Sequence, residues 1–167
     1  MRAGRASPAP SPSVALRLTV QYATTRPVPP RDRVRRWVRA ALVSQRVTVA
    51  ALTVRFVDDD EARALNRGYR GRDYATNVLT FPYAHDDGRV EADLVVAMPV
   101  VEREAAAQGK SALEHCAHLV VHGALHAAGL DHEDGDDAVA MEAAERAVLA
   151  RFRIDDPYRD GLATVAR

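Results

Sequence analysis

The stretch His122-Gly-Ala-Leu-His-Ala-Ala-Gly-Leu-Asp-His132 decides how the rest of this 167-residue chain has to fold. His122 and His126 are four residues apart, so on a helix they lie one turn apart on the same face and can direct their ring nitrogens at one ion. Gly129 can adopt the left-handed backbone conformation that ends a helix, so the chain can turn back and bring in His132 from a loop. The pattern predicts a metal site with three imidazole ligands.

Three imidazoles with no fourth protein ligand nearby are typical of a catalytic zinc site, in which water fills the open position. The chain has six histidines, and five of them lie within 18 positions, between residues 115 and 132. Chance explains such clustering poorly, so we expect one Zn²⁺ per chain. We interpret His115 and His118 as structural groups on the same helix that either support the ligands or lie on the surface, because three ligands and a water complete the site.

Length and composition favour a single intracellular domain. A chain of 167 residues can bury a core without disulfides, and the single Cys116 cannot form an internal disulfide, which favours a reducing compartment. No apolar run is long enough to cross a bilayer. We therefore expect a cytoplasmic protein that does not associate with membranes.

The net charge of zero conceals an uneven distribution. Residues 1–56 carry 11 Arg and one acid, whereas residues 57–167 carry 12 Lys or Arg and 22 acids. A chain divided in this way can present a basic face to a polyanion and remain soluble.

Three regions are expected along the chain. Residues 1–13 are rich in Pro, Ala and Arg and are predicted to be a disordered leader, because three alternate prolines prevent a helix. Residues 14–154 are predicted to form a single metal-dependent domain. Residues 155–167 are predicted to be a C-terminal tail.

Alternation and helical spacing predict the elements of that domain. Strands are expected at 15–22, 52–57, 78–81 (ended by Pro82) and 92–98. Helices are expected at 31–45, at 99–109 and at about 136–152. Two further helices are expected, one from Asp58 as N-cap to near Gly68 and one that begins at the Ser111 capping box. The last two strands are expected to pair as a hairpin. Because strands and helices do not alternate regularly, we predict an α+β fold with a small mixed sheet of about four strands packed with about five helices. The metal site lies on a central helix and the loop after it.

The spacing of the three histidines is also that of the metzincin proteases, whose signature is H-E-x-x-H-x-x-G-x-x-H. Here Gly123 stands where those enzymes have glutamate. The usual general base for hydrolysis of a peptide bond is therefore missing. A zinc metallopeptidase-like hydrolase stays an alternative that would need a base from elsewhere in the chain.

Three motifs, in order, resemble the YbeY family of bacterial endoribonucleases. They are Tyr69-Arg-Gly-Arg-Asp-Tyr-Ala-Thr-Asn-Val-Leu-Thr-Phe-Pro82, Ala92-Asp-Leu, and His118-Leu-Val-Val-His-Gly-Ala-Leu-His-Ala-Ala-Gly-Leu-Asp-His132. The resemblance covers about residues 50–152. It implies an α+β metalloprotein with zinc on the three histidines, so that the domain at 14–154 would be a nuclease. It also implies single-strand-specific RNA cleavage, maturation of the 3′ end of 16S rRNA, and ribosome quality control.

The chain departs from the family pattern at a few positions, none of them a predicted ligand. Asn77 stands where many members have Asp, Ala92 where Gly is usual, and Cys116 where some have Trp, and the Pro-rich leader is extra. These departures concern substrate detail more than the metal.

Arg70 matches the important arginine of the family in the motif Y-R-G-x-D, and we expect it in a loop before a strand. A guanidinium can neutralise the charge that develops on a phosphodiester with two parallel hydrogen bonds, while zinc lowers the pKa of water to about 7. His118, Asp131 and Asn77 are predicted to support the ligands or to contact substrate. The alternative for Arg70 is an exposed loop residue.

The expected partners are single-stranded RNA, including the 16S rRNA precursor, and the ribosome or its small subunit; the sequence does not predict an oligomeric state. Arg35, Arg36 and Arg39 are possible RNA contacts in the basic first third of the chain, and a solvated helix face is the alternative. A second alternative for the whole protein is a non-catalytic, ribosome-associated zinc protein. In that case His118 or Asp131 would close the fourth position on the metal.

Overall fold

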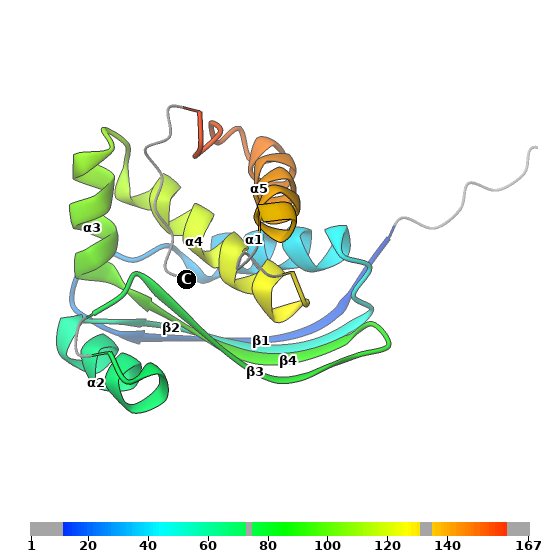
Figure 1. The fold of residues 1–167 in the computed structure, drawn as a ribbon, viewed down its shortest axis with the longest axis horizontal. Coiled ribbons are helices and arrows are strands. Elements are labelled where there is room, and N and C mark those ends of the chain that lie inside the picture. Colours follow the sequence, from blue (N-terminus) through cyan, green and yellow to red (C-terminus); the bar gives the residue numbers. More distant parts are fainter. Residues whose placement is uncertain (1–11, 73–74, 131–134, 160–167) are drawn as a thin grey trace, which may run out of the picture.

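The computed structural model describes residues 12–72, 75–130 and 135–159. In these residues four strands and five helices follow in the order β1 (Ala15–Ala23), α1 (Arg31–Ser44), β2 (Val49–Val57), α2 (Asp59–Arg70), β3 (Val78–Asp86), β4 (Arg89–Ala97), α3 (Met98–Ala107), α4 (Ala112–Ala127) and α5 (Gly135–Ala150). The strands form one layer, with α1, α4 and α5 on one face and α2 on the other (Figure 1). The predicted α+β fold is confirmed.

The sheet is mixed and has the strand order β1-β2-β4-β3. β2 pairs in parallel with both β1 and β4, while β3 pairs antiparallel with β4 as the predicted hairpin. Asp87 and Gly88 form the turn between them, with positive φ angles of 42° and 78°. Two positive φ angles are what a two-residue type I′ turn requires, which explains the Asp-Gly pair at this point.

Strand β3 is longer than expected, because Pro82 does not end it. The strand continues to Asp86, and its register with β4 shifts between Pro82 and Ala84. Proline has no N–H to donate, but β3 is an edge strand of the sheet, where a missing donor and an irregularity are tolerated. The predicted end at Pro82 is therefore wrong. The additional residues of the strand include His85, which reaches the loop after α4.

Side chains of β4 alternate between two apolar clusters, one on each face of the sheet. Leu94 and Val96 belong to the larger cluster, which also contains residues of α1, α4 and α5, whereas Val95 and Ala97 pack with Ala62 of α2 on the other face. Helix α4 lies in the larger cluster, and most of its side chains are buried. It contacts β3 and β4 below and α1, α3 and α5 around it. This packing on several sides fixes the rotation of α4 and with it the direction of its histidines.

The helix ends follow the predicted signals with two differences. The Ser111 hydroxyl accepts the Glu114 N–H at 3.1 Å, as the capping box predicts. Asp58 occupies the N-cap position of α2, but its carboxylate accepts the Thr24 hydroxyl at 2.5 Å instead of capping the helix. Helix α2 also continues past Gly68 to Arg70 and ends at Gly71, whose φ is 69°. Arg70 is therefore the last residue of a helix and not a loop residue.

Cys116 belongs to the larger apolar cluster of the core. It is fully buried on α4, and burial raises the pKa of its thiol to about 12. A thiol in such surroundings packs as a small apolar group and is not a nucleophile. Of the helices that the structure describes, none is both long enough and apolar enough to span a bilayer.

Candidate metal centre

Helix α4 presents His122 and His126 on one face, as the spacing predicts. Their ring centroids are 6.4 Å apart, and His122 is buried whereas His126 is half-buried. The two rings thus lie side by side at the end of the helix, with His126 nearer to solvent. His132 and Asp131 lie outside the described residues, and within 12–72, 75–130 and 135–159 no group of three potential ligands surrounds a metal position. The three-histidine set stays a prediction, of which the structure positions two members.

Gly129 meets two requirements that only glycine satisfies. Its φ is 104°, a left-handed conformation that L side chains rarely adopt. In addition, a Cβ atom at this position would overlap the ring of His85 on β3. The chain therefore turns directly after α4, as predicted, with an imidazole from the neighbouring hairpin against the turn.

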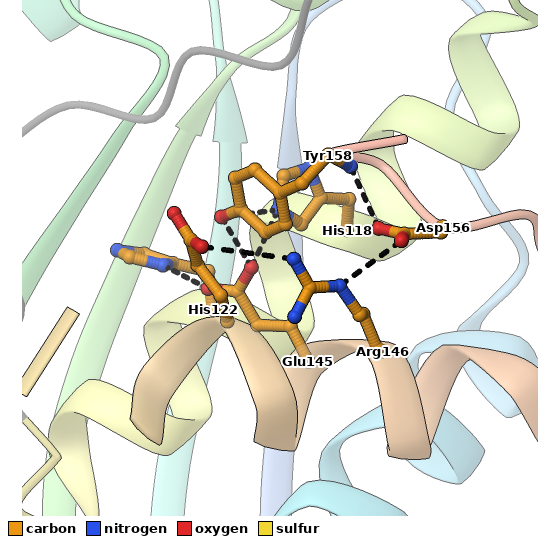
Figure 2. Close-up of polar contacts among 7 residues, drawn as sticks. His118, His122, Glu145, Arg146, Asp156 and Tyr158 are labelled. Atoms are coloured by element: carbon orange, nitrogen blue, oxygen red, sulfur yellow. Dashed lines mark hydrogen bonds and ion pairs between the residues drawn. The ribbon is translucent and has the colours of Figure 1, made fainter. Parts of the chain in front are cut away.

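Glu145 of α5 is the buried group behind His122, and it was not predicted. Its side chain has no exposed surface, and its two oxygens accept from three donors (Figure 2). Oε1 accepts from His122 Nδ1 at 2.6 Å, whereas Oε2 accepts from His118 Nε2 at 2.8 Å and from the Tyr158 hydroxyl at 2.5 Å. A buried carboxylate is acceptable only with such partners, so these hydrogen bonds are what allow Glu145 to lie in the core.

Burial and hydrogen bonding shift the pKa values of three side chains in this network, those of Glu145, His118 and Tyr158. Burial would raise the pKa of Glu145, but the hydrogen bonds from His118 and His122 outweigh it and lower the pKa to about 2. Burial lowers the pKa of His118, against the opposing effect of Glu145, and burial together with Glu145 raises the pKa of Tyr158. At neutral pH the network therefore consists of an ionised Glu145 that accepts from a neutral His118 and from a protonated Tyr158.

A second network, which is partly buried, lies nearer the start of α4. Glu104 of α3 is within hydrogen-bond distance of His115 Nε2, at 3.1 Å, and accepts from Asn77 Nδ2 at 3.0 Å. Asn77 in turn accepts the N–H of Val78 through its own oxygen. His115 lies two turns before His122 on α4, so these contacts place Asn77 beside the helix that carries the predicted ligands His122 and His126. His115 and His118 are both buried, which agrees with a structural interpretation and excludes a surface position.

Gly123 occupies the position at which the metzincin motif has its catalytic glutamate. A Cβ atom at Gly123 would lie 2.6 Å from Leu94 Cδ2 and 3.5 Å from Thr80 Oγ1. This face of α4 therefore packs directly on the sheet, with Leu94 fully buried beneath it. A glutamate would have to enter the core, so the structure offers no support at this position for the peptidase alternative.

We expect Gly123→Ala to destabilise the fold by about 1–3 kcal/mol, because the added methyl group overlaps a core leucine that has no free space to enter. The measurement is the free energy of unfolding from urea titration. Gly68→Ala is the matched control: nothing lies within 4 Å of a Cβ at Gly68, on an exposed part of α2. There the better helix propensity of alanine should stabilise the protein by up to about 1 kcal/mol. Equal stability of the two variants would contradict the close packing of α4 on β4.

The donors that the structure positions fit a zinc ion. Imidazole nitrogens are ordinary zinc ligands, and a ligating histidine usually donates its other ring N–H to a carboxylate. His122 has this arrangement: because Glu145 can only accept, the proton of the His122 ring is on Nδ1, and Nε2 carries the lone pair that a metal requires. The fit rests on this pairing, which directs one ring nitrogen of His122 to the carboxylate and leaves the other for a metal.

Comparison with known proteins places this arrangement in a family. The sequence model of endoribonuclease YbeY matches residues 21–153 of the chain. The chain belongs to the endoribonuclease YbeY family. The resemblance seen in the three motifs is thereby confirmed, and it extends further toward the N-terminus than the motifs themselves.

Individual relatives in the YbeY family cover most of the chain. An endoribonuclease YbeY from Paraburkholderia phymatum is 56% identical over 130 residues, which cover 77% of this chain and 82% of the relative. The endoribonuclease YbeY of Alkalilimnicola ehrlichii is 54% identical over 153 residues, covering 87% and 92% of the two chains. The solution structure of TM1509 from Thermotoga maritima aligns with a TM-score of 0.56 at 23% identity, over 83% of this chain and 91% of that one. That last similarity shows the fold alone.

Arg70, which matches the family arginine, lies at the end of a helix on the opposite face of the sheet from α4. It ends α2, which covers one face of the sheet, while α4 covers the other (Figure 1). The preceding Tyr69 ring packs edge-on against Phe81 of β3, with centroids 4.5 Å apart. Thr80, the neighbour of Phe81 on β3, faces α4. Among the described residues Arg70 has no hydrogen bond or ion pair, so no described side chain neutralises its guanidinium.

The three arginines predicted to contact RNA lie on two different faces of α1. Arg35 is half-buried and donates to the carbonyl of Leu16 on β1 at 3.4 Å, and Arg39 is half-buried one turn later. Arg36 is exposed and pairs with Asp32 at 3.6 Å. Arg36 is thus the one of the three on the solvent side of the helix, and contact of any of them with RNA stays a prediction.

Proposed function

We propose that this chain is a zinc-dependent endoribonuclease that cleaves single-stranded RNA in the cytoplasm. The observation that carries the proposal is the His122–His126 pair with the buried Glu145 behind it, in a chain that belongs to the endoribonuclease YbeY family. Its substrate is the precursor of 16S rRNA, which it cleaves in the maturation of the 3′ end and in ribosome quality control. The ribosome or its small subunit is then the partner on which it acts.

In this proposal His122, His126 and His132 hold one zinc ion per chain. When bound, zinc supplies a Lewis acid that makes water a usable nucleophile near pH 7 and withdraws charge from phosphoryl oxygens. The protein residues do the remaining work: Glu145 fixes the ring of His122, and Arg70 neutralises charge on the phosphodiester as it is cleaved. No carboxylate base next to the first histidine is required, which is consistent with Gly123 at that position.

In the alternative of a purely structural zinc site, His118 would be a fourth ligand of the metal. The contacts of His118 in the structure give little support to this role. A structural site usually closes its fourth position with a protein ligand, and His118 is the described candidate for that role. Its Nε2 is instead within hydrogen-bond distance of Glu145 and the Tyr158 hydroxyl, and its Nδ1 is buried without a partner. In this proposal His118 supports the carboxylate behind His122 and is not the fourth ligand of the metal.

The proposal is tested by measuring metal content and RNA cleavage on the same preparation. The protein is stripped with a chelator, reconstituted with zinc, and given a defined single-stranded rRNA fragment, the same fragment as a duplex, and casein. We expect one zinc per chain, cleavage of the single strand that depends on zinc, and neither duplex cleavage nor proteolysis. Zinc binding with no cleavage of any RNA would favour the non-catalytic alternative, and cleavage of casein would favour the peptidase.

A further inference from the structure

The segment that follows α5, residues 155–159, contacts α5 through specific side-chain interactions. Asp156 accepts from Arg146 Nε at 3.0 Å and from the N–H of Tyr158 at 2.8 Å. The Arg146 guanidinium also lies over the Tyr158 ring, 5.6 Å from its centroid. Although residues 155–167 were expected to be a tail, residues 155–159 fold back onto α5 in this way (Figure 2).

These contacts place the Tyr158 hydroxyl within hydrogen-bond distance of the buried Glu145. The ring of Tyr158 meets that of His118 edge-on, at 5.4 Å and 88°, and its hydroxyl donates to Oε2 of Glu145. The same carboxylate holds His122 through its other oxygen. A continuous path of hydrogen bonds therefore runs from the C-terminal segment, through Tyr158 and Glu145, to the first histidine of the predicted ligand set.

We propose that Glu145 and Tyr158 are positioning residues for the metal ligand His122, and that the segment 156–158 is a strap that holds them in place. Three donors around one carboxylate leave it a single orientation, so Oε1 faces Nδ1 of His122 and fixes both the rotation and the tautomer of that ring. Without Tyr158, Oε2 keeps His118 as its only donor and the carboxylate can rotate. Without Glu145, the buried His122 ring loses the acceptor that holds its proton on Nδ1.

This inference rests on the proposed function in one respect, the assignment of His122 as a metal ligand. It goes beyond that function because it gives the C-terminal segment a part in metal affinity. The segment touches neither metal nor substrate in this proposal, so its effect has to be visible in metal binding and in the state of the His122 ring, and not only in turnover.

The test compares wild type, Glu145→Gln and Tyr158→Phe by zinc competition against a chromophoric chelator. Glutamine cannot accept from three donors, and we expect Glu145→Gln to weaken zinc binding by about 10–100-fold, the usual effect of losing the partner of a ligating histidine. Tyr158→Phe should weaken it by about threefold to tenfold, the scale of one hydrogen bond. Tyr83→Phe is the matched control, because Tyr83 is an exposed residue on β3 whose hydroxyl donates to Asp93. Its zinc affinity should equal that of wild type.

A second measurement on the metal-free proteins separates positioning from general stability. Long-range ¹H–¹⁵N spectra of the histidines should show His122 protonated on Nδ1 in wild type and a mixture of tautomers in Glu145→Gln and, less so, in Tyr158→Phe. Should Glu145→Gln fail to fold, Tyr158→Phe alone decides, since it removes only one oxygen from a half-buried side chain. Zinc binding by wild type with unchanged affinity in the folded variants overturns the positioning role alone. A wild type that binds no zinc overturns the proposed metal site, and the positioning role with it.

Discussion

His126→Ala should abolish tight zinc binding and lower the rate of RNA cleavage by at least about 10³-fold. The reason is that a Lewis acid contributes several kcal/mol to the stabilisation of a phosphoryl transition state, and each 1.4 kcal/mol is worth a factor of about ten in rate. His126 is half-buried at the end of α4, so alanine at this position removes a predicted ligand without opening a cavity in the core. Bound metal is measured by elemental analysis, and cleavage on the single-stranded rRNA fragment.

The control for His126→Ala is its own stability with and without zinc. In excess chelator the variant and wild type should unfold at nearly the same temperature, because the helix is otherwise intact. Zinc at about 100 times its dissociation constant should stabilise wild type by about 2.7 kcal/mol and leave the variant unchanged. A variant that retains both zinc and activity would remove His126 from the ligand set, and one that unfolds even in chelator would show that the residue has a structural role.

The sequence predicts those parts of this fold that depend on local patterns. The apolar spacing of residues 31–45 predicts α1, the Asp87-Gly88 pair predicts the β3–β4 hairpin, and the Ser111 capping box predicts the start of α4, and all three are present. The errors arise where tertiary context outweighs a local rule. Pro82 is accommodated because β3 turns out to be an edge strand, and strand order is a property of the whole sheet that no short stretch contains.

In the candidate site, too, the residues related by a local pattern are predictable from the sequence, and those brought together by tertiary packing are not. The pair His122 and His126 is predictable because both lie on one helix, four residues apart. Glu145 is 23 residues away on another helix, and its contact with His122 depends on how α5 packs on α4. A signal was nevertheless present: Met141, Glu145 and Val148 follow one another at spacings of four and three, so Glu145 is a charged residue on the apolar stripe of α5. A charge at such a position requires buried partners, and the histidines of α4 supply them.

The second large effect is expected at Arg70. We expect Arg70→Ala to keep the fold and the zinc but to lower the kcat for RNA cleavage by about 10²-fold, the usual cost of removing a group that stabilises developing charge. Arg70→Lys should recover only part of the loss, because lysine carries the charge but cannot form two parallel hydrogen bonds to a phosphate. Arg63→Ala is the matched control, since Arg63 is an exposed arginine two turns earlier on the same helix; its turnover should stay near that of wild type.

Because of the position of Arg70, the decisive observation is whether its replacement lowers kcat or raises KM. Helices α2 and α4 lie on opposite faces of the sheet, and Tyr69, the neighbour of Arg70, packs against Phe81 of the edge strand β3. A guanidinium that reaches the scissile phosphate around this edge acts in the transition state, so its loss lowers kcat. A guanidinium that binds RNA farther along the strand holds substrate and transition state equally, so its loss raises KM and leaves kcat unchanged. A pure KM effect would therefore move Arg70 from the reaction centre to the RNA-binding surface, and unchanged turnover would remove it from both.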